Sequence, residues 1–466
     1  MKKHSIKLAA VPVALALVAG ACGSDSESSS SDEPDTEVET DTTDATADEG
    51  DAEASGDMDF GGQEILITGS ERDDPSVAAI NFALDQFEER ANVSVEFVGD
   101  ADWETNINTQ VEGGNPPDIS FFPQPGKLRD FAADDFIVPL SDGVNAAIDE
   151  YWAESYQADG QTEDGTQYGV PAKTDLKSVV WYQPARFEEA GYEIPETFEE
   201  FQALVDEMAA ADGPAPLCVG IESGAATGWT FTDWTEEMVL RQHGPEVYDQ
   251  WVSHEIPFND PRIVESMDTV VQLWSDDNVF ASSGSIVATN FADNAEPLVA
   301  GDCFMHRQAN FFGGFFPAGQ AFADESDPDS VDVFYFPDID GSRPVLTAGT
   351  LAAAFNDDEA TMAVLEFIAS AEYAEIRQAE QTAQLDGAIS GFLSAAQGQD
   401  ESVYQPLEQN FLSILADAEV SRFDGSDLMP SSVGAGSFWT EATSLVNGDI
   451  DAQEAADRIE DSWPAE

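Results

Sequence analysis

The chain has 466 residues and a formal net charge of −76, with 93 acidic residues against 17 Lys and Arg. A surface this negative repels phosphate backbones and anionic lipid headgroups, which argues against nucleic-acid binding and against electrostatic attachment to a membrane. The length is sufficient for two or three domains with sizeable cores.

The N-terminal segment has the pattern of a lipoprotein signal. Basic residues open the chain, an apolar stretch follows at 8–19, and two small residues precede Cys22. The stretch is shorter than the roughly 20 residues that cross a bilayer as a helix. We therefore expect a signal peptide over 1–21 and a lipid on Cys22 that holds the protein at the outer face of the cytoplasmic membrane. Ala19 is smaller than the residue usual at this position, and plain secretion is the alternative.

Residues 22–59 follow as an acidic segment. Between 23 and 59 there are 15 acidic residues, no Lys or Arg, and only Val38 and Met58 as larger apolar residues. Such a stretch cannot bury enough apolar surface to fold, and repulsion between like charges extends it. We predict a disordered acidic tether.

The folded body opens with a strand, a helix and a second strand. An apolar run at 65–68 is followed, after Ser76, by apolar residues at every third or fourth position over 77–87. Apolar and polar residues then alternate over 93–97. These periods predict a βαβ unit with parallel strands.

Helix and strand patterns continue to alternate further along the chain. Thr197 and Glu200 have the spacing of a capping box before an apolar helix face that extends to Met208. Residues 331–336 predict a strand, and residues 360–376 predict helical structure. The mixture favours an α/β fold.

Two cysteines, Cys218 and Cys303, remain beyond the predicted lipidation site. Outside the cytoplasm an even pair favours a disulfide. Two buried free thiols are the alternative.

Patterns typical of catalysis are incomplete in this sequence. His254 and Glu255 begin a zinc-protease motif, but Phe258 stands where the second His ligand belongs. Residues 338–341 resemble part of a calcium loop without its other ligands, and a turn is the better interpretation. A nucleophile elbow and a phosphate-binding loop are also missing from the sequence. We expect no catalytic site, metal or cofactor.

Aromatic residues stand beside small polar residues in segments rich in Gly, Pro and Asn, which typically form loops. These segments are 115–126, 168–171 with 181–182, 228–234, 305–312 and 429–439. Aromatic faces stack on sugar rings, while carboxylates, amides and Arg bind the hydroxyls. The pattern favours an uncharged sugar as ligand, and ordinary core packing is the alternative for each aromatic residue.

At these residues the body resembles the family 1 extracellular solute-binding proteins of ABC importers, which include the maltose-binding proteins. The resemblance covers about residues 65–463 and is greatest to the α-glucoside-binding branch. The segments that carry it are 114–119, 174–178, 218–224, 254–261, 305–309 and 427–430.

The resemblance implies a periplasmic-binding-protein-like (type II) α/β fold, with two lobes around a hinge and a ligand cleft between them. By resemblance, residues 60–170 plus 347–400 form the first lobe and residues 171–346 plus 401–466 the second. The chain is expected to cross the hinge near 170–171, 346–349 and 398–403.

The resemblance also implies the residues of the cleft. The first lobe is expected to contribute Ser70, Glu71, Trp103 and Gln124, and the second Trp229, Asp233, Trp234, Arg307 and Trp439. Trp439 matches the position of a sugar-stacking Trp, whereas Pro123 and Pro125 beside Gln124 differ from the maltose-type pattern. Two interpretations remain open for Arg307: hydrogen bonds to sugar hydroxyls, or pairing with buried acids. Asp175 and Lys177 are either polar contacts at the cleft or a solvated pair.

The leading hypothesis is a lipid-anchored, monomeric receptor that captures a neutral oligosaccharide, specifically an α-glucoside, and delivers it to the permease of an ABC importer. A polyol or a β-linked oligosaccharide is an alternative ligand. A secreted glycosidase and a structural surface lipoprotein are the alternatives from other functional classes.

Overall fold

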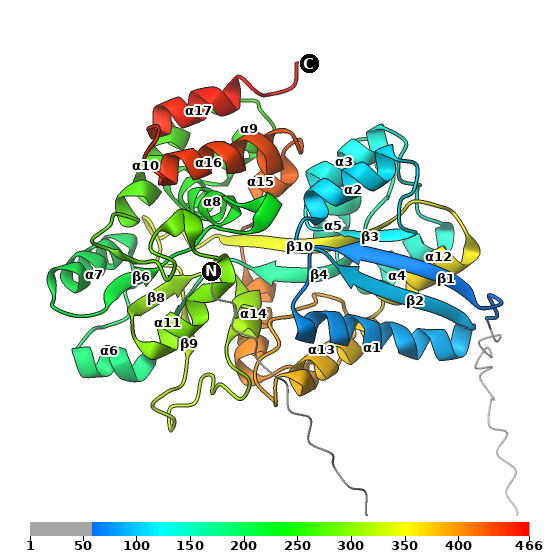
Figure 1. The fold of residues 1–466 in the computed structure, drawn as a ribbon, viewed down its shortest axis with the longest axis horizontal. Helices are drawn as coiled ribbons and strands as arrows, with labels where there is room; N and C mark the ends of the chain where they lie inside the picture. The colour runs from blue at the N-terminus through cyan, green and yellow to red at the C-terminus, as the bar shows by residue number, and fades with distance from the viewer. Residues whose placement is uncertain (1–57, 466) are drawn as a thin grey trace, which may run out of the picture. The chain divides into compact units, whose positions relative to one another are not determined.

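The structure is a computed structural model that describes residues 58–465 (Figure 1). The predicted signal peptide, the lipid on Cys22 and nearly all of the predicted tether therefore lie outside the described residues. None of the helices in the described part combines the length and the apolar character needed to cross a bilayer.

Six strands form the first sheet, in the order β11-β10-β3-β1-β2, with β4 paired to β10 beside this path. The strands are β1 (Gln63–Gly69), β2 (Val93–Gly99), β3 (Ile119–Phe122), β4 (Val170–Leu176), β10 (Val345–Ala354) and β11 (Ser421–Phe423). β1 is parallel to β2 and β3, which confirms the predicted parallel βαβ pairing, whereas β10 is antiparallel to β3 and β4.

Helices cover both faces of the first sheet, with α1 and α13 on one face and α2 and α3 on the other (Figure 1). The helices associated with this sheet are α1 (Asp74–Ala91), α2 (Trp103–Glu112), α3 (Pro125–Ala133), α4 (Asp142–Tyr151), α5 (Glu154–Gln157), α12 (Glu359–Ile368) and α13 (Ala371–Gln384). Adjacent residues Phe121 and Phe122 on β3 pack into different core clusters, because successive side chains of a strand point to opposite faces.

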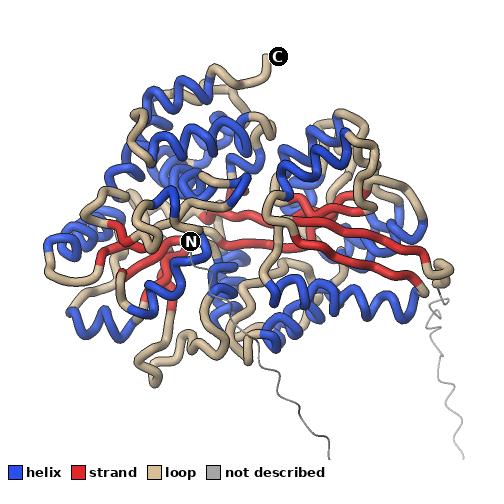
Figure 2. The backbone as a smooth tube through the Cα atoms, in the orientation of Figure 1, coloured by secondary structure: helices blue, strands red, loops and turns tan. Residues whose placement is uncertain are grey.

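The second sheet has five strands in the order β7-β6-β8-β5-β9. Figure 2 shows the strands of both sheets in red, with helices and loops around them. They are β5 (Val179–Tyr182), β6 (Ala215–Cys218), β7 (Val279–Phe280), β8 (Cys303–Arg307) and β9 (Asp332–Tyr335). Val180 and Tyr182 pack into one core cluster and Val179 and Trp181 into another, so this sheet is also buried on both faces. The predicted α/β class is confirmed.

The remaining helices lie after β5 in the chain. They are α6 (Pro184–Ala190), α7 (Phe198–Ala210), α8 (Trp229–His243), α9 (Pro245–Val252), α10 (Pro261–Leu273), α11 (Ala295–Ala300), α14 (Pro406–Asp417), α15 (Gly425–Leu428), α16 (Trp439–Val446) and α17 (Ala452–Glu460).

Local sequence signals explain where several helices begin. The capping box of Thr197 and Glu200 is confirmed at the start of α7. α1 begins earlier than the apolar spacing suggests, because the Asp73 side chain accepts a hydrogen bond from the Ser76 backbone N–H. The helical segment predicted over 360–376 is divided between α12 and α13, since Ser370 caps a new helix.

The predicted disulfide is confirmed between Cys218 and Cys303, whose Cα atoms are 5.5 Å apart. Cys218 ends β6 and Cys303 begins the neighbouring strand β8, with which β6 pairs in parallel. The bond closes a segment with a sequence separation of 85 residues within the second sheet.

Two of the predicted hinge crossings fall on β4 and β10, which pair with each other from Leu176 opposite Thr347 to Val170 opposite Ala352. The third falls near the short 3-10 turn Glu401–Val403. The division into lobes at these positions remains a prediction.

Candidate ligand-binding cavity

A cavity of about 400 Å³ lies among loops and helix ends that are connected to strands of both sheets. Its size is within the range typical of small-molecule sites. Six of the residues predicted for the cleft line it: Ser70, Glu71, Gln124, Asp175, Trp229 and Trp439. The structure therefore brings these side chains together from β1, α3, β4, α8 and α16 and the segments next to them.

The other four predicted cleft residues do not line this cavity. Trp103 is 1% exposed and donates its Nε1–H to Ser120 Oγ at 2.9 Å. Trp234 is a core residue that packs edge-on against Trp274 and Phe336. Asp233 and Arg307 belong to a buried charge cluster next to the cavity, described below.

Six aromatic side chains contribute to the cavity wall: Trp229, Phe291, Phe311, Phe315, Phe392 and Trp439. The ring centroids of Trp229 and Phe291 are 5.1 Å apart, and those of Phe291 and Phe315 are 5.6 Å apart. Phe311 lies within an aromatic segment visible in the sequence, but Phe291 and Phe315 carry no comparable signal. These rings provide the apolar surface on which a sugar ring can stack.

Trp439 is held at the cavity by an unusual local backbone. It follows the π-helical turn Val433–Phe438 and begins α16. Gly228 has a φ of +115°, and a Cβ atom on it would be 2.3 Å from the Trp439 carbonyl oxygen. Only glycine fits both the conformation and the close approach at this position. The Trp439 side chain is buried, yet its Nε1–H has no hydrogen-bond partner among the described residues.

Several other polar atoms of cavity-lining side chains are buried without a partner in the described part of the chain. They are Glu71 Oε2, Gln124 Oε1, Asp175 Oδ1, Gln381 Oε1, and Arg377 Nε and Nη1. A buried polar group without a hydrogen bond destabilises the folded state, so native proteins usually satisfy such groups. Both donors and acceptors are present, which suits ligand groups that can donate and accept.

Asp175 and Lys177 do not form the solvated pair considered from the sequence. Both are buried and line the cavity. Asp175 Oδ2 lies 3.4 Å from Lys173 Nζ, whereas Lys177 Nζ donates to Asp233 Oδ1 at 2.7 Å and also to Asp424. They are buried polar residues with different partners.

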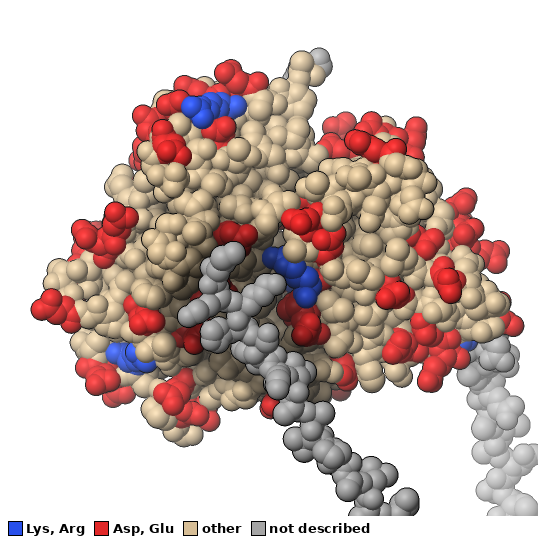
Figure 3. Space-filling view, in the orientation of Figure 1, with Lys and Arg blue, Asp and Glu red and all other residues tan. Residues whose placement is uncertain are grey.

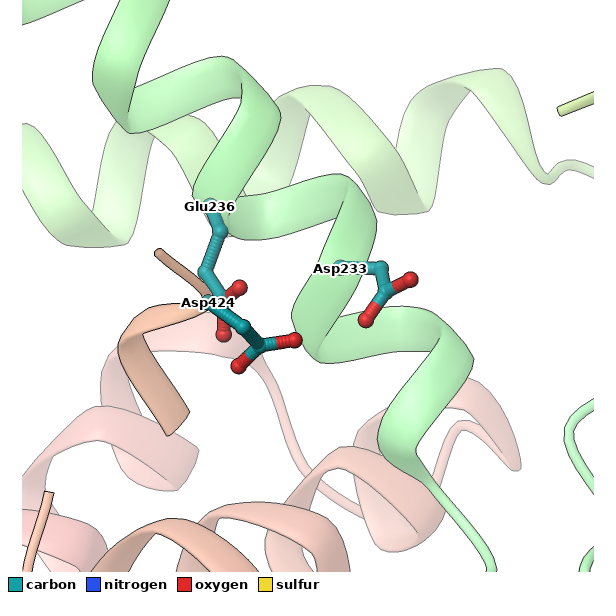
Figure 4. Close-up of side chains that lie close together, drawn as sticks. All are labelled: Asp233, Glu236 and Asp424. Atoms are coloured by element: carbon teal, nitrogen blue, oxygen red, sulfur yellow. The ribbon is translucent and has the colours of Figure 1, made fainter. Parts of the chain in front are cut away.

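Next to the cavity, Asp233 and Glu236 of α8 lie close to Asp424, which precedes α15 and lines the cavity (Figure 4). Together with Glu237 of α8 they form a buried charge cluster. Arg307 Nη2 donates to Glu237 Oε2 at 2.7 Å, and its Nη1 lies 3.7 Å from Asp233 Oδ2. These contacts correspond to the interpretation in which Arg307 pairs with buried acids.

Three cations pair with three of the four acids in this cluster. Lys177, Arg241 and Arg307 face the carboxylates of Asp233, Glu237 and Asp424. Burial raises the pKa of Asp233 to about 7, although the charge of Lys177 acts in the opposite direction. Burial opposes ionisation of Glu237 as well, but Arg241 and Arg307 hold its pKa below the usual range.

Glu236 and Asp427 form none of these ion pairs, and burial raises the pKa of each well above its usual range. Carboxylate oxygens of Asp233, Glu236 and Asp424 lie within 4.8 Å of one another, a spacing that could hold a metal ion. The ammonium of Lys177, however, already donates to two of the three carboxylates. The chain thus provides the positive charge itself.

His306 is part of the core beneath the cavity. Its Nδ1 lies 2.9 Å from the Cys218 carbonyl oxygen, and its Nε2 lies 2.9 Å from the Gln308 side-chain amide. Burial lowers the pKa of His306 to about 4, so the ring is neutral near pH 7. Its position indicates a structural role next to the disulfide.

The family model described as bacterial extracellular solute-binding protein matches residues 72–375. The alpha-glucosides-binding periplasmic protein AglE of Rhizobium meliloti is 34% identical over 420 residues, covering 87% of this chain and 88% of AglE. The osmoprotective compounds-binding protein GgtB of Synechocystis sp. is 35% identical over 396 residues, covering 83% of this chain and 89% of GgtB.

Solved structures of sugar receptors share the fold. The bacterial solute receptor AcbH superposes with a TM-score of 0.72 at 18% identity, covering 86% of this chain and 98% of AcbH. RafE in complex with raffinose superposes with a TM-score of 0.64 at 18% identity, covering 86% of this chain and 98% of RafE. The predicted periplasmic-binding-protein-like fold is confirmed.

Proposed function

The chain belongs to the family of bacterial extracellular solute-binding proteins, and from this premise we propose that it captures a neutral α-glucoside in the cavity of Trp229 and Trp439. Proteins of this family are solute-binding receptors of ABC importers rather than enzymes, and they act outside the cytoplasm. Delivery of the sugar to a membrane permease follows from that role.

The observation that carries the proposal is the combination of aromatic faces with unpaired buried donors and acceptors around one cavity. A sugar has apolar ring faces for the aromatic residues and hydroxyl groups that both donate and accept. Charged wall residues pair with one another, as Lys173 does with Glu71 and Asp175. A charged ligand would compete with these ion pairs, which favours a neutral one.

The relatives support two ligand classes. AglE is named for α-glucosides, and GgtB, at nearly the same identity, is named for osmoprotective compounds. A small neutral osmolyte of the polyol or glycoside type is therefore the second candidate. Both classes present hydroxyl groups, so the same cavity chemistry fits either.

A thermal-shift screen of the whole chain distinguishes these candidates. The panel contains trehalose, maltose and sucrose as α-glucosides, sorbitol as a polyol, cellobiose as a β-linked sugar and gluconate as an anion. A ligand at 100 times its dissociation constant adds about 2.7 kcal/mol to the free energy of unfolding. We expect the largest shift with an α-glucoside. A shift with gluconate alone would contradict the proposal.

We predict that Trp439→Ala weakens binding of the α-glucoside by about 1–3 kcal/mol, because the substitution removes an aromatic surface at the cavity. The measurement is the dissociation constant from tryptophan fluorescence or calorimetry. Trp463→Ala is the matched control, since Trp463 stacks on His254 and does not line the cavity. Equal affinity in the wild type and Trp439→Ala would exclude Trp439 as a ligand contact.

We further propose that the lobes predicted from the resemblance close around the ligand as hinged bodies. The pairing of β4 with β10, on which two of the three crossings fall, supports this division. Residues of the cavity come from both proposed lobes, for example Glu71 from the first and Trp229 from the second. Closure would remove the bound sugar from solvent. Small-angle scattering should show a smaller radius of gyration with the sugar than without it.

We propose that a lipid on Cys22 anchors the receptor and that the acidic segment up to residue 59 acts as the tether. The sequence pattern before Cys22 supports this. Cys22→Ser is expected to release the protein from the membrane fraction into the soluble fraction while sugar affinity stays unchanged. Retention of the variant in washed membranes would contradict lipid anchoring.

A further inference from the structure

Part of the cavity wall is formed by Glu71, Arg377 and Gln381, a group we call the Arg377 subsite. Arg377 and Gln381 are one turn apart on α13, and Glu71 follows β1. All three line the cavity, and the side chains of the two α13 residues are almost fully buried, with Arg377 1% and Gln381 3% exposed. None of the sequence signals discussed above identifies Arg377 or Gln381.

Existing contacts fix the direction of the Arg377 side chain. Its Nη2 donates to Glu71 Oε1 at 2.5 Å, and its guanidinium lies 4.1 Å from the centroid of the Phe392 ring. Nε and Nη1 have no hydrogen-bond partner in the described residues. The nearby Tyr373 hydroxyl also lacks one. The guanidinium is thus flanked by Glu71 and the Phe392 ring, and two of its N–H groups make no hydrogen bond within the described residues.

Gln381 and Glu71 supply the complementary acceptors. Gln381 Nε2 donates to Ser76 Oγ at 3.0 Å and to the Ser390 carbonyl oxygen at 2.8 Å, which fixes the amide. Its Oε1 remains without a partner, as does Glu71 Oε2. The subsite therefore offers two donors and two acceptors from three side chains.

The charges around the subsite are already balanced. Arg377 pairs with Glu71, Glu71 Oε1 lies 3.6 Å from Lys173 Nζ, and Lys173 lies 3.4 Å from Asp175. A ligand carboxylate would face Glu71, and a ligand ammonium would face Arg377. Two neighbouring hydroxyl groups fit better, because each hydroxyl accepts one hydrogen bond and donates another.

We infer that the Arg377 subsite binds a vicinal diol of the ligand. This inference rests on the proposed function and adds to it the hydroxyl pair that the receptor recognises. Arg377 and Gln381 are then specificity-determining residues. Ligands that lack either hydroxyl of the pair should bind more weakly than the parent sugar.

The test combines substitutions in the protein with removal of single hydroxyls from the ligand. The probe is whichever of trehalose, maltose and sucrose binds the wild type most tightly, together with its monodeoxy analogues. Arg377→Lys keeps the positive charge beside Glu71 but removes the planar donors. Gln381→Met is the second variant. It keeps a similar side-chain length and removes the Oε1 acceptor together with the two hydrogen bonds that Nε2 donates to Ser76 and Ser390. Calorimetry gives the dissociation constants.

In the wild type, removal of each of two adjacent hydroxyls should weaken binding about tenfold or more, as expected for hydrogen bonds to a charged group. Arg377→Lys should weaken binding of the parent sugar about tenfold to a hundredfold. In this variant, removal of either of those two hydroxyls should raise the dissociation constant by less than about threefold. In Gln381→Met, removal of one hydroxyl of the pair should likewise change the dissociation constant less than it does in the wild type.

Arg90→Lys is the matched control, because Arg90 of α1 pairs at an exposed position with Glu372 of α13, the helix that also carries Arg377. It should leave every dissociation constant within about twofold of the wild type. The subsite is refuted if Arg377→Lys weakens the parent and all deoxy analogues equally, or weakens none of them. If the wild type binds none of the three sugars, the proposed α-glucoside function itself fails, which is a different result.

Discussion

Lys177→Met is expected to lower the free energy of unfolding by about 3–5 kcal/mol, because it leaves two buried carboxylates without their shared cation. Lys177 Nζ donates to Asp233 and Asp424, and all three side chains are at most 5% exposed. Met keeps a similar length and volume, so the main change is the loss of charge. Urea denaturation near pH 8 measures the difference.

The difference should decrease at lower pH. Burial raises the pKa of Asp233 to about 7 even with Lys177 present. Loss of the ammonium raises the pKa values of Asp233 and Asp424 in the folded variant above those in the wild type. Protonation at low pH therefore stabilises the folded variant relative to the wild type. Arg422→Met is the control, since it breaks an exposed pair with Asp249 and should cost at most about 1 kcal/mol. Equal losses of unfolding free energy in Lys177→Met and Arg422→Met would refute the role of Lys177 as the shared cation of the two buried carboxylates.

Removal of the disulfide is the second large expected effect. The double variant Cys218→Ser with Cys303→Ser should lose about 4–5 kcal/mol of unfolding free energy in the chain-entropy model, because the bond closes a loop with a sequence separation of 85 residues. The comparison is made by urea denaturation. Reduction of the wild type with dithiothreitol should produce a loss of similar size.

The same reductant should have no effect on the stability of the double variant, which controls for other actions of dithiothreitol. Ligand affinity should change little in the folded fraction, because neither cysteine lines the cavity. A loss below about 1 kcal/mol in the double variant would show that the crosslink contributes little to the stability of the second sheet.

Local sequence signals were sufficient for much of the fold. The βαβ unit at 63–99 and the helix start at Thr197 follow from periodicity and capping, which act over a few residues. The disulfide follows from the cysteine count and the compartment. The break at Ser370 was missed because apolar residues continue through it, and only the cap hydrogen bond ends one helix pattern and begins the next.

The cavity could be predicted less completely. Trp229 and Trp439 line it, but Trp103 and Trp234, predicted on the same grounds, are buried in core clusters. A Trp in a loop-rich segment is equally suited to core packing and to ligand contact, so tertiary structure decides between them. Arg377 lies on an ordinary helix, and its role depends on Glu71, 306 positions away in the chain.

The acidic composition also limited prediction of the buried charges. Acidic residues are spread over the face of the protein seen in Figure 3, and basic residues are few. With 93 acids in the sequence, the partners of Lys177 and Arg307 could not be identified from residue types. Only the packing of α8 against β8 and the segment at Asp424 shows which carboxylates are buried beside them.

Isothermal titration of the whole chain tests most directly whether the cavity captures a neutral glycoside, as we propose. Titration with trehalose, maltose and sucrose should give saturable binding of one molecule per chain for at least one sugar, and Trp439→Ala should weaken that binding. Saturable binding of gluconate or another charged ligand, with no heat of binding from any neutral glycoside, would contradict the account.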